Sequence, residues 1–243
     1  MKYSLPVLFI LLPLSVMSQK LKKVSSDNPR STIKEIYEVL KSDTAIKQGS
    51  YKKHQWGRLI TEGYYKNNKK DSIWQEYGYA GKLSSKRYYK DGVAVGVWEF
   101  YEWNDNIDKY NMPGNTWIDH KPAVADTLKS AIINGSDTLY AVLDHPAVYV
   151  PGDRRQQLLL VRAIRYPAKA KENNTMGKVL IAVTVAEHGH ATNYRIKKNV
   201  KNGLGEEALR VALMMDDDWL PGMLNGKPVR SEYVFPISFA LAE

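Results

Sequence analysis

Apolar and polar residues alternate most clearly in the C-terminal part of the chain. Every second residue of the segment 178–186 is apolar, and this period of two predicts a strand with one buried face. The apolar positions are Val179, Ile181, Val183 and Val185. A Glu-His-Gly-His turn follows at 187–190, and residues 191–198 are expected to return as a second strand. The two segments together predict an antiparallel hairpin.

Helical spacing appears on both sides of this hairpin. Asp153 is a candidate N-cap for a helix of about three turns that ends at Tyr166-Pro167, because a proline disfavours helix in the residue before it. Residues 204–215 repeat apolar side chains at the period of a second helix, and residues 229–241 alternate again as a last strand. The order helix, strand, strand, helix, strand predicts a compact α+β domain with a three-stranded antiparallel sheet.

The N-terminal part has a different pattern, an aromatic motif that repeats after 24 residues. The string Tyr-Tyr-Lys-Asn-Asn at 64–68 recurs as Tyr-Tyr-Lys-Asp-Gly at 88–92, and Trp-Gln-Glu-Tyr at 74–77 recurs as Trp-Glu-Phe-Tyr at 98–101. A fixed period in this range is typical of a repeat array. Because Asn-Asn and Asp-Gly are hairpin turns, residues 35–103 are expected to form consecutive β-hairpins in an elongated sheet.

These repeats resemble the variant MORN repeat, a β-hairpin repeat common in exported bacterial proteins. The strings Lys-Asp-Gly at 90–92 and Gly-Val-Trp at 96–98 fit its pattern, whereas the earlier unit has Ser72 in place of the glycine before its tryptophan. Half of the aromatic residues of the chain lie between Tyr51 and Trp103. Two interpretations stay open: the rings fill the packed face of the sheet, or part of the stripe binds glycan, lipid headgroup or protein.

The ends of this array are marked by changes in composition. Residues 104–143 lose the period and are expected to be a connector with a small hairpin. At the N-terminus, residues 1–18 have a lysine, a short apolar run and small residues before Gln19, which is the form of a cleavable signal peptide. The run is shorter than the roughly 20 apolar residues of a membrane span. An uncleaved anchor remains the alternative.

Composition narrows the possible functions. The chain of 243 residues has no cysteine, which excludes a disulfide framework, a thiolate metal site, a cysteine nucleophile and a lipid-modified N-terminal cysteine. Its formal net charge of +9 is spread along the chain without a basic stripe, so nucleic acid is not expected as a partner. Mean hydropathy is −0.43, which excludes a membrane protein with many spans.

The C-terminal part carries an ordered set of motifs that looks like the C-terminal domain of TonB energy transducers. The resemblance covers residues 144–243 and begins with the lead-in His-Pro-Ala-Val-Tyr at 145–149. The motifs are Tyr-Pro-Ala-Lys-Ala at 166–170, Gly-Lys-Val at 177–179, Glu-His-Gly at 187–189, Glu-Ala-Leu at 207–209, Trp-Leu-Pro-Gly at 219–222, Asn-Gly-Lys-Pro-Val at 225–229 and Phe-Pro-Ile-Ser-Phe at 235–239.

This resemblance implies a binding function in the cell envelope. Proteins of the family meet outer-membrane receptors from the periplasmic side, where a short receptor segment pairs with an exposed sheet edge. Pro236 has no N–H and therefore belongs at an edge or a bulge, which makes residues 229–241 the candidate edge strand. The candidate partner-binding residues are Tyr166, Pro167, Arg230, Ser231, Glu232, Tyr233, Val234 and Phe235. For Tyr166-Pro167 the alternative is a helix stop whose tyrosine packs on the sheet.

The expected function is that of a periplasmic protein of a Gram-negative bacterium that binds a strand of an outer-membrane receptor or another envelope protein. The chain lacks the long proline-rich spacer of a transducer, so an envelope scaffold whose aromatic repeats bind glycan, lipid or protein is the alternative. A homodimer and peripheral association with the membrane are further open partners. The acidic run Asp216-Asp217-Asp218 is expected to be solvated, or else to contact a cation or a basic partner.

Enzyme chemistry has little support. Gly203-Leu204-Gly205-Glu206-Glu207-Ala208 matches a dinucleotide-binding pattern but lacks the following parallel strand, and His188-Gly189-His190 has no third metal ligand beside it. No nucleophile elbow, phosphate loop or pair of catalytic carboxylates is evident. The sequence therefore predicts a protein with no catalytic residues, no metal and no cofactor.

Overall fold

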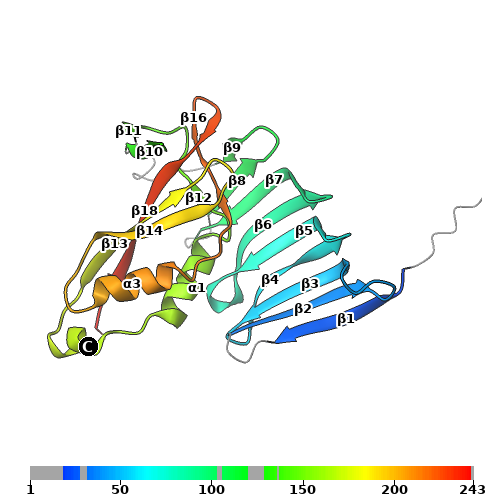
Figure 1. Cartoon of the computed structure of the whole chain (residues 1–243), viewed down its shortest axis with the longest axis horizontal. Coiled ribbons are helices and arrows are strands. Elements are labelled where there is room, and N and C mark those ends of the chain that lie inside the picture. The colour runs from blue at the N-terminus through cyan, green and yellow to red at the C-terminus, as the bar shows by residue number, and fades with distance from the viewer. Residues whose placement is uncertain (1–18, 28–31, 103–105, 120–128, 136, 242–243) are drawn as a thin grey trace, which may run out of the picture.

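The computed structural model describes residues 19–27, 32–102, 106–119, 129–135 and 137–241. The chain forms two modules, a long curved sheet of hairpins and a smaller mixed domain that packs against it (Figure 1). The expected signal peptide, residues 1–18, lies outside the described residues. Within the described residues, no helix is long and apolar enough to cross a membrane.

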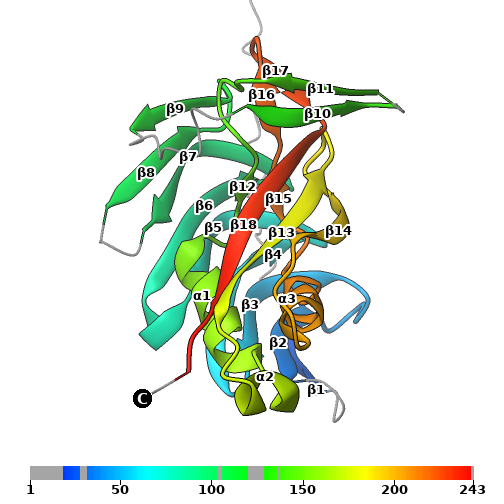
Figure 2. The same cartoon turned by 90° about the vertical axis from the view of Figure 1, so that its left-hand side faces the viewer.

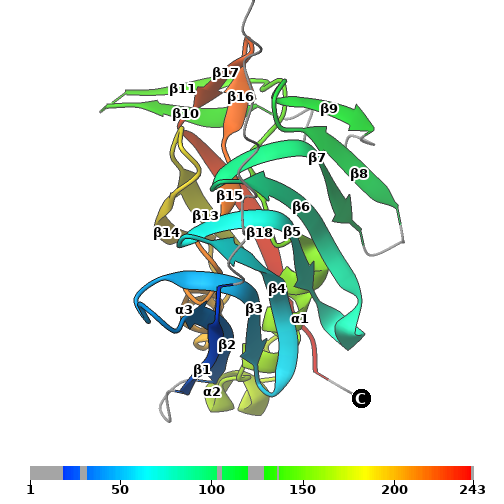
Figure 3. The ribbon, with the colours of Figure 1, turned by 90° about the vertical axis from the view of Figure 1, so that its right-hand side faces the viewer.

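The first module, which we call the hairpin array, is a nine-stranded antiparallel sheet in chain order, seen along its length in Figure 3. Its strands are β1 (Leu21–Asp27), β2 (Ile33–Leu40), β3 (Lys47–Gln55), β4 (Arg58–Lys66), β5 (Lys69–Tyr77), β6 (Leu83–Lys90), β7 (Val93–Tyr101), β8 (Ile107–Asn111) and β9 (Thr116–Asp119), with a short 3₁₀ helix, η1 (Tyr79–Gly81), before β6. The array is longer than the predicted segment 35–103 because β1 precedes this segment and β8 and β9 follow it.

The turns at the period of 24 have the backbone that the sequence predicted. Asn67 and Asn68 have φ of 49° and 64°, and Asp91 and Gly92 have φ of 50° and 87°. Two successive residues with positive φ make the tight hairpin turn whose twist matches that of the strands. The repeat extends to a side-chain contact, since the indole of each repeat tryptophan, Trp74 or Trp98, donates to the carbonyl ten residues earlier, at 3.1 and 3.3 Å.

The second module, the C-terminal domain, is built on a five-stranded sheet in the order β11-β10-β18-β13-β14. Its sheet strands are β10 (Ser130–Asn134), β11 (Asp137–Ala141), β13 (Gly177–Val185), β14 (Ala191–Lys198) and β18 (Ser231–Phe239). The helices are α1 (Asp153–Ala163), α2 (Ala168–Glu172) and α3 (Leu204–Ala212), and the short strands are β12 (Val148–Tyr149), β15 (Trp219–Leu220), β16 (Gly222–Leu224) and β17 (Lys227–Val229).

This arrangement confirms the predicted fold class, an N-terminal hairpin sheet followed by a small α+β domain. The three predicted strands β13, β14 and β18 are adjacent and antiparallel. The sheet has five strands because β10 and β11, from the segment expected to be a connector, form a hairpin that joins it at the start of β18. The alternating residues of β13 face a buried core that α3 covers with Leu204, Ala208 and Ala212.

A second core joins the two modules. Trp98, Phe100 and Tyr110 of the hairpin array pack against Val150 and Leu220 of the C-terminal domain, and each of the five side chains is at least 94% buried. The apolar face of a single-layer sheet must be covered by another element. The C-terminal domain supplies that cover, so the aromatic repeats and the C-terminal domain share buried surface.

Candidate functional site

Strand β18 has one side fully paired and the other side largely open. Along one side it pairs with β13 over its whole length, from Val185 opposite Ser231 to Gly177 opposite Phe239. On the other side, the only pairing in the described part of the chain is with β10, through Ile132 opposite Ser231. Figure 2 shows β18 crossing the domain with β10 and β11 at one end. The segment after Glu232 therefore presents an unpaired backbone edge.

The direction of the backbone groups on this edge follows from one hydrogen bond. The N–H of Ile133 on β10 donates to the carbonyl of Arg230 at 2.9 Å, so the backbone carbonyl of Arg230 points away from β13. Backbone groups alternate sides along an antiparallel strand. Val234, Pro236 and Ser238 then point their backbone groups to the open side. Pro236 has no N–H to lose there, which explains how a proline is tolerated inside a nine-residue strand.

A groove runs between this edge and helix α1. Its volume is about 580 Å³. The lining residues are Asp153, Gln156, Gln157, Leu160, Val161 and Ile164 on or just after α1, and Pro236, Ile237 and Ser238 on β18. Val161 is 56% exposed although it is apolar. The groove thus combines unpaired backbone groups on one wall with apolar and amide side chains on the other.

The predicted site residues at the start of β18 do not lie on this open edge. Arg230 and Ser231 meet β10, as described above, and Ser231 is fully buried. Glu232 is 92% buried and forms ion pairs with Arg195 and Lys197 of β14. The expectation that the whole segment 229–241 is an exposed edge is therefore wrong at its beginning, because β10, from the hairpin expected in the connector, pairs with it.

The remaining predicted residues are divided between the core and the groove. Tyr233 and Phe235 point into the core, where the Tyr233 ring lies 5.4 Å from Trp219, and only Val234 of this group directs backbone groups to the open side. Tyr166 packs its ring 5.8 Å from Phe239 and donates its hydroxyl to the carbonyl of Thr175 at 2.6 Å.

Pro167 directly precedes α2. The contact of Tyr166 with Phe239 places the pair Tyr166-Pro167 at the far end of β18, where four residues of strand, about 13 Å, separate Phe239 from Phe235. This placement agrees with the alternative that the sequence left open, a helix stop whose tyrosine packs on the sheet.

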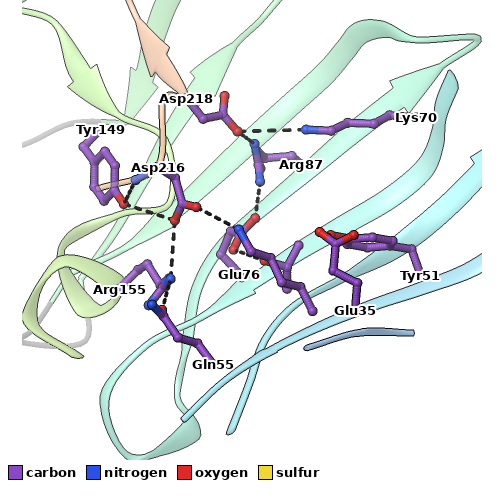
Figure 4. A network of polar contacts seen from close by, with 12 residues as sticks. Glu35, Tyr51, Gln55, Lys70, Glu76, Arg87, Tyr149, Arg155, Asp216 and Asp218 are labelled. Atoms are coloured by element: carbon purple, nitrogen blue, oxygen red, sulfur yellow. Dashed lines mark hydrogen bonds and ion pairs between the residues drawn. The ribbon is translucent and has the colours of Figure 1, made fainter. Parts of the chain in front are cut away.

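In the acidic run Asp216-Asp217-Asp218, Asp217 is solvated as expected, whereas Asp216 and Asp218 form ion pairs with basic side chains. Asp216 accepts from Lys53 at 2.9 Å. It also accepts from Arg155 at 3.4 Å, a contact drawn in Figure 4. Burial alone would raise the pKa of Asp216, but these two cations outweigh it and hold the pKa below its usual range. Asp217 caps the start of β14 through the N–H of Ala191 at 2.6 Å. The run is thus part of the contact between the modules.

Asp218 continues this network into the hairpin array. It accepts from Arg87 at 2.5 Å, and Arg87 also pairs with Glu76 at 2.5 Å, although the Arg87 and Glu76 side chains are only 1% and 7% exposed. Thr61 donates to Glu76 at 2.8 Å. Burial raises the pKa of Glu76, against the opposing effects of Arg87 and Thr61.

Sequence reasoning missed this buried pair, but a signal was present. At the offset of 24, Arg87 takes the place of Gly63, and Phe100 takes the place of Glu76. In each pair one repeat has a charged residue, Arg87 or Glu76, and the other repeat has an uncharged one. The face of the sheet on which they lie is otherwise aromatic. The position of a charged residue inside an apolar repeat could have marked where the array meets its partner module.

The repeat aromatics form a packed ladder on the face that the C-terminal domain covers. Tyr51 lies 5.3 Å from Trp74, and Tyr89 lies 5.4 Å from Trp98, measured between ring centroids. Trp74 and Trp98 are 2% and 3% exposed. Of the two open interpretations, this burial favours rings that fill a packed face.

No group of three or more histidine or acidic side chains within the described residues could hold a metal ion. His188 and His190 lie with their rings 4.9 Å apart, and His190 contacts Asp217 at 2.9 Å. The strongest chemical feature of the domain is accordingly the strand edge, which offers hydrogen bonds to another backbone.

Comparison with known proteins shows what the C-terminal domain is similar to. The structure of the Helicobacter pylori TonB-CTD, determined by NMR in solution, matches at 24% identity over 39% of this chain and 90% of that chain, with a TM-score of 0.29. A search of curated proteins gives no match. The resemblance of the array to MORN repeats stays a prediction. Residues 162–241, about a third of the chain, match the family described as the Gram-negative bacterial TonB protein C-terminal.

Proposed function

We propose that the chain is an exported periplasmic binding protein of TonB-type transport, in which an extended segment of an outer-membrane receptor pairs with the open edge of β18. The match of residues 162–241 to the TonB C-terminal family supports this class of partner. The protein acts by binding, without catalysis and without a cofactor.

The observation that carries the proposal is the unpaired edge after Glu232, with the groove beside it. An added strand gains main-chain hydrogen bonds along an edge, and every second side chain contacts the neighbouring wall. Val234 and Ser238 each offer an outward N–H and carbonyl, and Pro236 offers a carbonyl. Leu160 and Val161 of α1 lie on the wall that the side chains of the incoming strand would face.

The alternative function, a scaffold whose aromatic repeats bind glycan or lipid, has weaker support. The rings that such a site would use, Trp74 and Trp98, are almost completely buried. Binding at these rings would require the C-terminal domain to separate from the array. The strand edge, in contrast, is open without any rearrangement of the described residues.

A proline substitution tests strand addition at one atom. Because the N–H of Val234 points to the open side, Val234→Pro removes an outward donor and leaves the hydrogen bonds to β13 in place. The loss of one such bond, about 1.4 kcal/mol, corresponds to about tenfold weaker binding. Val234→Thr is the matched control, since it keeps the N–H and a branched side chain.

The measurement is a fluorescence anisotropy titration with labelled synthetic peptides that copy the periplasmic N-terminal segments of outer-membrane receptors. We expect at least one segment to bind the unchanged protein and the Val234→Thr variant with similar affinity, and to bind Val234→Pro about tenfold more weakly. Ser238→Pro replaces it if Val234→Pro is unfolded by circular dichroism. If no segment binds, or if both proline variants bind normally, the proposal is wrong.

Export is tested separately by the intact mass of the protein from the envelope fraction. Cleavage of the leader predicts a chain that starts at Gln19. A chain that retains residues 1–18 in the membrane fraction would instead support an anchored protein, and with it coupling of the domain to the inner membrane.

A further inference from the structure

Helix α1, one wall of the groove, is shared between the two modules. In Figure 2, α1 lies between the strands of the hairpin array and β18. Arg154 and Arg155 of its first turn contact the array, Leu160 packs on the core of the C-terminal domain, and residues from both ends of α1 line the groove. The position of this wall relative to β18 therefore depends on both modules. This raises the question of what the array contributes to the groove.

Two buried arginines in the first turn of α1 form hydrogen bonds with the array. Arg154 donates to the carbonyl of Leu83 at 2.8 Å, and Arg155 donates to the side chain of Gln55 at 2.7 Å. The backbone N–H of Arg155 also donates to the hydroxyl of Ser84 at 3.1 Å. The two arginines are 4% and 3% exposed. Buried hydrogen bonds from charged groups are costly to break, so this contact is held firmly.

The backbones of the two modules also approach each other closely at this point. A Cβ atom added at Gly78 would lie 2.2 Å from the carbonyl group of Arg154, and one added at Gly152 would lie 2.8 Å from the carbonyl oxygen of Ser84. These distances leave no space for a larger residue. The array and α1 are thus in direct backbone contact, with glycine required on each side.

The C-terminal end of α1 also reaches the groove. Leu160 and Ile164 pack against the core of the C-terminal domain, and Val161 is exposed in the groove. Trp56, in the turn between β3 and β4, packs on the cluster of Leu159 and Ala163. Contacts with the array therefore extend along α1, from Arg154 to the residues next to the groove wall.

We propose that the hairpin array is the positioning element for α1, and that it sets the geometry of the groove beside β18 and hence the affinity for the incoming strand. The inference rests on the proposed strand addition. Its consequence is that a change confined to the array, which does not form the strand edge, alters partner binding.

The test uses Gly78→Val, because the new side chain must displace the backbone of Arg154 and touches no residue of the groove. Gly78 has a φ of −113°, which lies outside the left-handed region that favours glycine. Lys90→Val is the matched control, since it places valine at an exposed position of β6 far from α1. If Gly78→Val does not fold, Gln55→Met removes the hydrogen bond to Arg155 from the array side instead.

Two measurements are made on the purified protein: hydrogen exchange of the α1 amides by mass spectrometry, and binding of the receptor peptide that binds the unchanged protein best. We expect Gly78→Val to speed hydrogen exchange in α1 about tenfold and to weaken peptide binding by about two- to thirty-fold. Lys90→Val should change neither the exchange rate nor the affinity.

The outcomes separate the two proposals. Faster exchange with normal peptide affinity, or no change in either measurement, would overturn the positioning role and leave strand addition intact. If the unchanged protein binds no receptor peptide, strand addition fails, and the positioning of a binding groove fails with it.

Discussion

The buried pair of Arg87 and Glu76 gives the sharpest prediction for stability. Arg87→Met removes the cation and keeps most of the side-chain volume. Glu76 then retains only the hydroxyl of Thr61 as a hydrogen-bond donor, at a position where its side chain is 7% exposed. A carboxylate left without its cation in such a place must be desolvated while charged, or else take up a proton.

The expected loss in the free energy of unfolding follows from the burial of Arg87 and Glu76. Removal of one member of a buried ion pair costs about 3 to 5 kcal/mol. For a chain of this size, each kcal/mol lowers the unfolding midpoint by about 2 to 4 °C, which gives about 6 to 20 °C in total. The double variant Glu76→Phe with Arg87→Met removes both charges and places at residue 76 the residue that the next repeat has, Phe100. It should recover most of the loss.

The assay is urea denaturation followed by tryptophan fluorescence, at neutral pH and again near pH 5. Burial already raises the pKa of Glu76, and loss of Arg87 raises it further. A carboxyl whose pKa is raised by folding favours the native state at low pH, so the loss caused by Arg87→Met should shrink in acid. A loss under 1 kcal/mol at neutral pH, or a double variant less stable than the single one, would refute the reasoning.

Two further predictions concern the contact between the modules. Trp98→Ala should destabilise the protein by about 3 to 5 kcal/mol, since it leaves a cavity in the core shared with Val150 and Leu220, and urea denaturation measures this loss. Asp216→Asn should destabilise the protein above pH 4 but little below it. The reason is that the pKa of Asp216 is lowered in the folded state, so the stabilisation disappears as that carboxyl is protonated. Thermal unfolding across pH 2–7 should give the variant and the unchanged protein equal midpoints in acid.

Local patterns were sufficient to predict the elements of the fold. The alternating residues of β13 and the turn residues Asn67-Asn68 and Asp91-Gly92 adopt the predicted structure because strand burial and positive φ are properties of a few neighbouring residues. A small hairpin was expected in the connector, but the pairing of β10 with β18 was missed because it joins residues about a hundred positions apart. Such pairing leaves no periodic trace in the sequence.

The candidate site was predicted in part for the same reason. Pro236 correctly indicated a strand with an open side, since a missing N–H is visible in the sequence itself. Glu232 was assigned to the exposed edge because its partners, Arg195 and Lys197, lie on another strand and cannot be paired from spacing alone. The groove wall was not predicted at all, because α1 is positioned by contacts with a different module.

The charges between the modules change the interpretation of the repeats themselves. A repeat array of independent units would be expected to carry the same apolar residue at each equivalent position. At the positions of Gly63 and Glu76 the two recognisable repeats differ, and the differences place Arg87 where it pairs with both Glu76 of the array and Asp218 of the C-terminal domain. Because Asp218 lies in the C-terminal domain, separation of the array from the domain would expose an aromatic face and remove one of the two carboxylate partners of Arg87. The two modules are therefore best regarded as one folding unit, in which the array has been adapted at specific positions to hold the domain that carries the open strand edge.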